Sequence, residues 1–151
     1  MIDTSLKPNT YTLCLASESE CPLAASCLRS LVYRQEQQAL AEKRKLTIVN
    51  HLSESLCYAT EQCVAYNSSA KSRFAKGMTH MFDNVPHSEY TVIHNAVKAC
   101  FSNRTFFFQS KTGARLIPTD TQAKIREVFL QHSLSEPLYD GYVDQYVWKD
   151  Y

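Results

Sequence analysis

Residues 14 to 28 read CLASESECPLAASCL, and this stretch decides how the first half of the chain folds. It places Cys14, Cys21 and Cys27 close together, and Cys57 and Cys63 follow further along the chain. Five of the six cysteines therefore lie within the first 63 residues. Because no other grouping of residues in the sequence points to specific chemistry, the cysteines are the candidate site, and they predict metal binding.

A structural zinc ion takes about four thiolate or imidazole ligands in a tetrahedron. We expect Cys14, Cys21, Cys27 and Cys63 to supply them, with Cys57 as the alternative to Cys63. An iron–sulfur cluster is the second metal hypothesis, since thiolate ligation suits it as well. No Cys-x2-Cys pair occurs, which excludes the usual zinc-knuckle spacing and a thioredoxin-type redox pair. The alternative without metal is that the thiols are buried and fill gaps between helices.

The composition is that of one soluble, folded domain. The chain has 151 residues, of which 44% are hydrophobic and 21% are charged. It contains no apolar run long enough to span a membrane, and residues 1 to 5 lack the layout of a secretory signal. We therefore expect a cytoplasmic protein. In that reducing compartment, structural disulfides are not expected.

Apolar periodicity predicts a mainly α fold of about five helices. Pro22 suits the first position of a helix, which makes 22 to 45 the longest predicted helix. Residues 102 to 118 fit either a short helix or one arm of a hairpin. The remaining predicted helices cover residues 72 to 78, 89 to 101 (with Ser88 as its cap), 121 to 132 and 139 to 147.

We predict a single domain over residues 1–151, divided at Pro86 and Ser135. Its parts are a cysteine-containing half (1–85), a helix-turn-helix-like half (86–135) and a docked aromatic tail (136–151). The middle part holds six basic and three acidic residues, whereas the tail holds one lysine and four acids. A basic tract of this kind can form a phosphate-binding face, although a solvated helix surface explains the same charges.

Signatures of enzymes are absent from the sequence. With three glycines, the chain cannot contain a glycine-rich phosphate loop, so no nucleotide cofactor is expected. His87-Ser88-Glu89 has the His-x-Glu form of a zinc deaminase, but the required Pro-Cys-x-x-Cys does not follow it. We therefore expect binding and not catalysis.

One resemblance covers most of the chain. Its residues are Cys21-Pro22-x4-Cys27-Leu28-Arg29, Phe74-Ala75-Lys76-Gly77-Met78, Val85-Pro86 and Tyr142-x3-Tyr146-x-Trp148. In these the chain resembles a bacterial family of small cysteine-containing proteins that is known only as a domain of unknown function. The resemblance implies a single-domain architecture and carries no activity.

A second, local resemblance covers residues 89 to 134, which look similar to small helix-turn-helix-like bacterial DNA-binding proteins. The similarity rests on Ile93, Val97, Phe101, Thr105-Phe106, Gly113, Pro118 and Ile125-x3-Phe129. It implies that residues 102 to 110 form the second helix and that Arg104, Gln109, Lys111 and Arg115 face phosphates or base edges of DNA. One of the three consecutive phenylalanines would then have to be exposed or covered by another segment.

These observations predict a non-enzymatic binding protein with a structural, cysteine-ligated zinc site and a nucleic-acid-binding basic tract. The alternative is a protein–protein interaction module with buried thiols and no metal. In that alternative, a partner chain docks on the aromatic tail through Tyr146, Trp148 and Tyr151.

Overall fold

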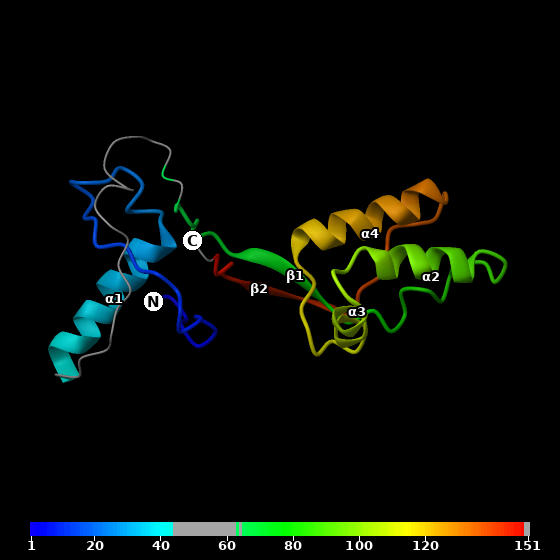
Figure 1. The fold of residues 1–151 in the computed structure, drawn as a ribbon, viewed down its shortest axis with the longest axis horizontal. Helices are drawn as coiled ribbons and strands as arrows, with labels where there is room; N and C mark the ends of the chain where they lie inside the picture. The colour runs from blue at the N-terminus through cyan, green and yellow to red at the C-terminus, as the bar shows by residue number, and fades with distance from the viewer. Residues whose placement is uncertain (44–62, 64, 150–151) are drawn as a thin grey trace. The chain divides into compact units, whose positions relative to one another are not determined.

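The computed structural model describes residues 1–43, 63 and 65–149, which form four helices and one two-stranded antiparallel sheet (Figure 1). These residues belong to two compact units. The N-terminal unit is Met1–Ala70 with Tyr146–Tyr151, and the central unit is Lys71–Gln145. The elements are, in order, α1 (Leu28–Lys43), β1 (Ser72–Lys76), α2 (Tyr90–Ala99), α3 (Arg104–Lys111), α4 (Thr119–Gln131) and β2 (Gly141–Gln145).

The architecture is mixed, whereas the sequence predicted a mainly α fold. Along the chain, the boundaries between the two compact units fall at Ala70–Lys71 and Gln145–Tyr146. The predicted divisions at Pro86 and Ser135 stay predictions. Folding of the whole chain as one domain stays a prediction. None of the helices in the described residues is long and apolar enough to cross a membrane.

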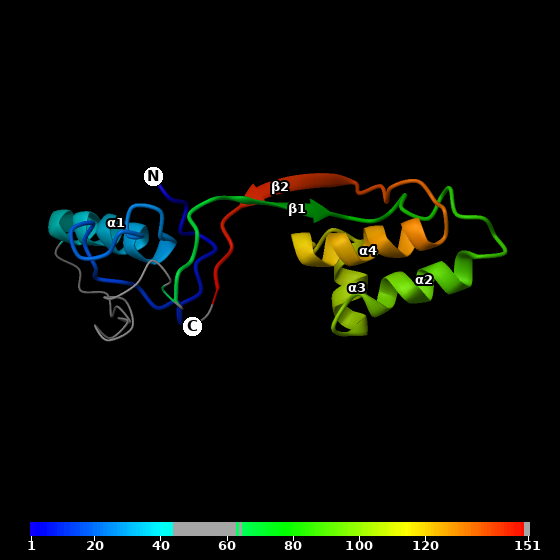
Figure 2. The same cartoon turned by 90° about the horizontal axis from the view of Figure 1, so that it is seen from above.

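The central unit begins and ends with the two strands. β1 and β2 pair antiparallel, with Phe74 opposite Val143 and Ser72 opposite Gln145 (Figure 2). Pairing therefore joins the two ends of this unit, and the three helices lie between them in the sequence.

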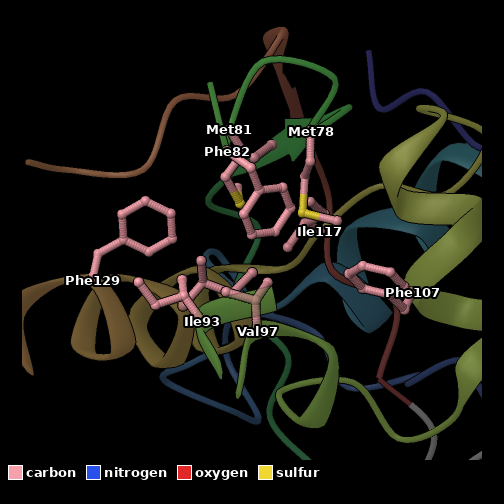
Figure 3. Close-up of a cluster of buried hydrophobic side chains, with 10 residues drawn as sticks. Met78, Met81, Phe82, Ile93, Val97, Phe107, Ile117 and Phe129 are labelled. Atoms are coloured by element: carbon pink, nitrogen blue, oxygen red, sulfur yellow. The ribbon is translucent and has the colours of Figure 1, made fainter. Parts of the chain in front are cut away.

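The helices of the central unit are amphipathic and share one core (Figure 3). The fully buried residues are Ile93 and Val97 in α2 and Ile125 in α4. Ile93 and Val97 are four residues apart and so fall on the same helix face. Burial of each such side chain stabilises the fold by about 1.5–3 kcal/mol. The predicted helices at 89–101 and 121–132 are confirmed as α2 and α4.

α3 follows α2 after a short connection. Its N-cap is Asn103, whose side-chain oxygen accepts a hydrogen bond of 2.8 Å from the backbone N–H of Phe106. The helix alternative for this part of the chain is therefore confirmed, and the hairpin arm is wrong for residues 104 to 111. The predicted cap of α2 is also wrong, because Glu89 and not Ser88 occupies the N-cap and makes no side-chain bond there.

Two predicted helices are strands. Residues 72 to 76 form β1, and the segment predicted as a helix over 139 to 147 contains β2. Both stretches place apolar residues at steps that also fit a helix. These residues form strands and not helices because the two stretches hydrogen-bond to each other. The stretches are far apart in sequence, so the local spacing of apolar residues cannot indicate this pairing.

In the N-terminal unit, α1 begins at Leu28 and not at Pro22. Residues 21 to 26 form turns instead, with the N–H of Ala24 donating to Cys21 and that of Ser26 donating to Leu23. Cys27 makes an antiparallel bridge with Ser68, which requires extended backbone there and delays the helix. The predicted end of this helix at Lys45 lies outside the described residues.

Two small apolar clusters fill the N-terminal unit. The first contains Tyr11, Leu13, Leu28 and Val32, with Tyr146 and Trp148 packed against it. The ring centroids of Tyr11 and Trp148 are 5.0 Å apart in an edge-on arrangement. Tyr146 and Trp148 are half-buried in this cluster, and the docking of residues 136–151 as one tail stays a prediction. Tyr151 lies outside the described residues. The second cluster contains Cys14 and Cys21, with Cys63 packed against it.

Candidate functional site

Four of the five predicted ligands line one cavity of the N-terminal unit. Cys14, Cys21 and Cys27 are buried, and Cys63 is half-buried. The cavity has a volume of about 10 Å³, which is roughly the space of one water molecule. Its remaining lining is small or apolar: Ala16, Leu23, Ala24, Ser30, Ala65 and Tyr66. The fifth predicted ligand, Cys57, lies outside the described residues.

Backbone hydrogen bonds bring these cysteines together from separate segments. The N–H of Cys14 donates to the carbonyl of Arg29 at 3.4 Å, and the N–H of Cys21 closes a turn onto Ser17 at 3.0 Å. Cys27 is held by its bridge to Ser68. Because each cysteine is fixed by a different contact, the site depends on the fold of the whole loop region and not on one continuous motif.

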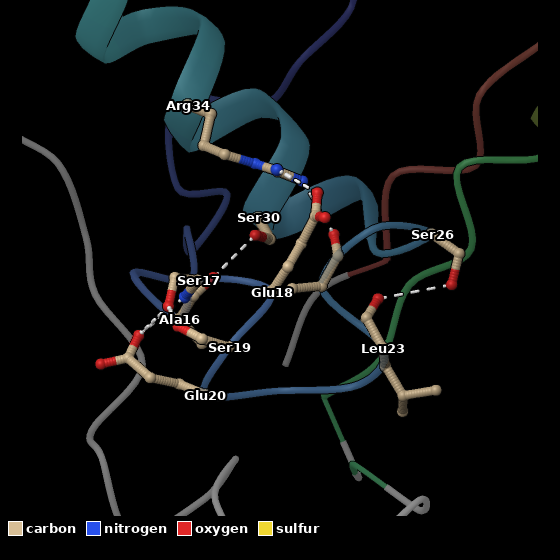
Figure 4. Close-up of polar contacts among 10 residues, drawn as sticks. Ala16, Ser17, Glu18, Ser19, Glu20, Leu23, Ser26, Ser30 and Arg34 are labelled. Atoms are coloured by element: carbon tan, nitrogen blue, oxygen red, sulfur yellow. Dashed lines mark hydrogen bonds and ion pairs between the residues drawn. The ribbon is translucent and has the colours of Figure 1, made fainter.

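Polar contacts tie the cysteine loop to α1 (Figure 4). The Ser30 hydroxyl, on the first turn of α1, donates to the carbonyl of Ala16 at 2.9 Å. Arg34, one turn later, forms an ion pair of 2.6 Å with Glu18. Within the loop, the pKa of Glu20 is lowered by hydrogen bonds from the side chain and backbone of Ser17. These contacts fix residues 16 to 20, which lie between Cys14 and Cys21.

A buried arginine donates a hydrogen bond to one residue of the cavity lining. Arg29 is 1% exposed, and its guanidinium donates to the carbonyls of Ala65 at 2.9 Å, Thr12 at 2.6 Å and Lys149 at 2.5 Å. Its charge also lies over the Tyr11 ring, 4.6 Å from the centroid. Within the described ranges, no carboxylate forms an ion pair with it. Buried charges are normally paired, so this one has an unusual environment.

A second buried polar residue completes the interior. Asn67 is 2% exposed and donates from its side-chain nitrogen to the Tyr11 hydroxyl at 2.8 Å and to the carbonyl of Val147 at 2.9 Å. Burial raises the pKa of Tyr11, partly offset by Asn67 and Arg29. Sequence reasoning missed Arg29 and Asn67. Arg29 entered only as part of the motif Cys27-Leu28-Arg29, because a charged residue next to an apolar stripe is normally interpreted as solvent-facing. Asn67 is an isolated polar residue, and no pattern in the sequence indicates its burial.

The four cysteines line the cavity without forming a finished coordination sphere. Among the residues that the structure describes, no three His, Cys, Asp or Glu side chains stand in a ready metal-binding arrangement. Cys100 lies in the central unit and is not part of this site. Its thiol donates to the carbonyl of Ala96 at 3.4 Å, and burial raises its pKa.

The predicted nucleic-acid contacts lie on and after α3. At about 100° per residue, Arg104 and Lys111 fall on one side of the helix, whereas Gln109 lies about 140° from Arg104. The Arg104 guanidinium is 5.3 Å from the ring centroid of Phe108. Arg115 stacks at 3.7 Å on Phe106, which lies toward the opposite side of α3 from Arg104. The four residues therefore do not form one surface.

The three consecutive phenylalanines of α3 point in different directions around the helix and so differ in exposure. Phe107 is fully buried in the central core, Phe106 is half-buried, and Phe108 is 43% exposed. Of the two alternatives, exposed or covered by another segment, Phe108 is therefore exposed, with Arg104 over its ring.

The described residues thus define a small chain of two units, one with a thiol-lined cavity and one with a helical core behind a two-stranded sheet. A family model described as "Family of unknown function (DUF6078)" matches residues 1–148, and the chain belongs to this family. The predicted membership in a family of unknown function over most of the chain is confirmed. The likeness of residues 89 to 134 to helix-turn-helix proteins stays a prediction. No curated protein and no solved structure matches the chain.

Proposed function

We propose that the chain is a non-enzymatic binding protein whose N-terminal unit is organised by one structural zinc ion. The proposed ligands are Cys14, Cys21, Cys27 and Cys63. The observation that carries this proposal is that four thiols from separate segments line one cavity of about 10 Å³. Such a space admits an ion and excludes a metabolite, since small-molecule pockets measure about 300–1,000 Å³.

Arg29 supports the proposal through charge. Four thiolates around a zinc ion carry a net double negative charge, which would be costly to bury alone. The Arg29 guanidinium is buried and donates a hydrogen bond to the carbonyl of the lining residue Ala65. A buried anion and a buried cation then compensate each other. In the metal-free alternative the arginine charge has no such partner among the described residues.

Zinc binding requires the thiol side chains to turn toward a common centre, because the described residues hold no ready arrangement. Cys57 is the proposed substitute for Cys63 as the fourth ligand. An iron–sulfur cluster is the second metal hypothesis for the same thiols, and its visible absorption separates it from zinc.

The test is metal analysis by mass spectrometry of the tag-free full chain and of single cysteine variants. We expect about one zinc per chain in the unmodified protein and in Cys100→Ser, whose thiol lies in the other unit. Cys21→Ser and Cys27→Ser should lose most of the zinc, because the four sites of a structural zinc are all occupied by protein ligands. The zinc contents of Cys57→Ser and Cys63→Ser are then compared, and the variant that loses the zinc identifies the fourth ligand.

Metal-free protein from a preparation without chelator, which takes up no zinc when it is supplied, would contradict the proposal. The interaction-module alternative with buried thiols would then replace it.

Nucleic-acid binding by the central unit is the second candidate function. It is favoured by the Arg104–Phe108 stack on the exposed side of α3, because cationic and aromatic groups together suit phosphates and bases. Lys111 lies on the same side of the helix. Arg115 and Gln109 would contact a nucleic acid only if it wrapped around the end of α3.

Retention on immobilised DNA at rising salt tests this candidate. Binding should weaken steeply with salt, since each neutralised phosphate releases a counterion. The double variant R104A/K111A should elute at clearly lower salt than K124A/R126A, a matched loss of two charges on α4 of the same unit. Absence of retention at low salt, or equal elution of the two variants, would contradict it.

A further inference from the structure

The outer edge of β2 lacks a partner strand among the described residues. The sheet has two strands, and β2 pairs with β1 alone. Figures 1 and 2 both show β1 on one side of β2 and no other described segment of the central unit along its opposite side. An edge strand of this kind presents unpaired backbone N–H and C=O groups that can accept another strand.

The hydrogen bonds that β1 makes to other segments show which of its backbone groups point away from β2. Ala75 exchanges two backbone hydrogen bonds with Ile117, of 3.0 and 2.8 Å. The carbonyl of Arg73 accepts a bond of 2.9 Å from the side chain of Gln122. Both contacts use groups that point away from β2, since the backbone groups of successive strand residues alternate in direction.

The register then fixes the direction of the β2 groups. Phe74 and Val143 form the hydrogen-bonded pair, so the backbone groups of Val143 point toward β1. Tyr142 and Asp144 lie opposite Ala75 and Arg73, and their N–H and C=O groups therefore point outward.

A cleft adjoins this edge. It has a volume of about 560 Å³ and lies between α4 and the chain that leads into β2. The side chain of Tyr142 is on the same face of the sheet as that of Ala75, which is buried toward the helices. The cleft is lined by Thr119, Gln122, Ala123, Arg126, Glu127, Leu130, Glu136, Pro137, Tyr139 and Tyr142.

The chemistry of the edge favours an incoming strand with a basic and an apolar residue. Residues 136 to 145 carry three carboxylates and no lysine or arginine. Asp144 is exposed, and among the described residues it forms no ion pair with Arg73, which lies opposite it on β1. Glu136 is paired with Arg126. Beside them, Tyr142 is 47% exposed and Leu130, on the cleft wall, is 58% exposed.

We propose that β2 binds a basic, extended segment of another polypeptide by antiparallel strand addition. A Lys or Arg of that segment lies opposite Asp144, where opposite charges across strands attract. Two residues later, an apolar side chain lies opposite Tyr142 and enters the cleft beside α4. The partner is thus defined by the pattern basic-x-apolar in an extended chain. This site belongs to the central unit and is independent of the proposed zinc site.

Amide NMR of the full chain tests the proposal. The probe is an acetylated, amidated peptide of sequence Thr-Lys-Thr-Leu-Thr. We expect saturable shifts of the Tyr142 and Asp144 amide signals. Replacing Lys by Glu in the peptide should weaken binding by about fivefold, because a cross-strand attraction becomes a repulsion. N-methylation of the Leu nitrogen removes one donor to Tyr142 and should abolish the shifts.

Protein variants supply the matched controls. Asp144→Pro removes an outward N–H that β1 does not use, a position where edge strands tolerate proline, and it should lose peptide binding. Val143→Thr should retain binding, since its backbone faces β1. Asp144→Lys should reverse the preference between the Lys and Glu peptides.

Three results would overturn the proposal. The first is no shift at Tyr142 or Asp144 with the Lys peptide. The second is an unchanged charge preference in Asp144→Lys. The third is a shift of these amides with protein concentration in the absence of peptide, which would assign the edge to a second copy of the chain.

Discussion

The interiors of the two units differ in what stabilises them. The central unit buries apolar side chains from regular elements, such as Ile93, Val97 and Phe107, all fully buried. The N-terminal unit buries cysteines and alanines in one cluster, together with Arg29 and Asn67. A core of the first kind is stabilised by burial itself. An interior of the second kind depends on satisfied polar groups, and in our proposal on a bound ion.

The chain contains a natural probe for this comparison. Its single tryptophan, Trp148, packs in the N-terminal unit against Tyr11. Emission from Trp148 therefore reports on that unit, while amide NMR signals of α2, α3 and α4 report on the central unit. Each substitution below is expected to act on one probe more than on the other.

The largest effect is expected from Phe107→Ala. Phe107 is fully buried and contacts the rings of His94, Phe101 and Phe108. Its loss leaves a cavity and should lower the free energy of unfolding of the central unit by about 3–5 kcal/mol. Urea titration followed by the α2–α4 amides measures this. Phe108→Ala, at a 43% exposed neighbour, should cost much less; equal losses would refute a core centred on Phe107.

Arg29→Met tests the polar interior of the N-terminal unit. The substitution leaves three carbonyls without their donor, those of Thr12, Ala65 and Lys149. We expect a loss of about 3 kcal/mol, since each buried unsatisfied group is costly. Urea titration followed by Trp148 emission measures it. The control, Arg34→Met, removes a partly exposed ion pair and should cost under about 1 kcal/mol. A similar cost for both would contradict the role of Arg29.

Gly77→Ala should have an intermediate effect on the central unit. Gly77 has φ +74°, and an added Cβ would lie 2.1 Å from Oδ2 of Asp140. Asp140 would have to move, although its carboxylate accepts bonds from the backbone and hydroxyl of Thr79. The left-handed backbone alone costs about 1–2 kcal/mol with a side chain. Gly141→Ala, with no atom within 4 Å of the added Cβ, is the matched control for thermal unfolding. Equal melting shifts would argue against the strain at Gly77.

The smallest effect concerns pH. Burial lowers the pKa of His94, and Lys111 and Lys98 lower it further. The unfolded chain therefore binds a proton near pH 6.5 that the folded chain binds only at lower pH. The contribution of neutral His94 to stability is complete above pH 6.5 and falls as the pH drops below that value.

Urea titrations of the central unit at pH 7.5 and 5.5 measure this. We expect His94→Phe to lose less stability on acidification than the unmodified chain. His80, whose pKa is raised by Asp83, is present in both proteins and cancels in the comparison. An identical pH response of the two proteins would contradict the shift at His94.

The same contrast between units decides how much could be predicted from the sequence. α2 and α4 were predictable because Ile93 and Val97, and Ile125 and Phe129, repeat at four-residue steps on a buried face. β1 and β2 were not, because each is stabilised by a partner far away in sequence. The predicted start of α1 at Pro22 was wrong for the same reason, because Cys27 pairs with Ser68, a residue far away in sequence.

For the candidate site, the cysteine spacing selected four residues that the fold brings to one cavity. The spacing could not indicate Arg29, because a charged residue in a helix is normally exposed. The separation of Gln109 from Arg104 could have been predicted, because a helix over residues 102 to 110 already places the two side chains about 140° apart. The stack of Arg115 on Phe106 could not, because it depends on the turn that follows α3.

The most direct test of the central claim follows both units of the full chain while zinc is removed by a chelator and then restored. We predict that Trp148 emission shifts to that of a solvent-exposed indole, while the amide signals of α2, α3 and α4 keep their positions, and that zinc reverses the change. Trp148 emission that responds neither to the chelator nor to added zinc would contradict the claim that an ion organises the N-terminal unit.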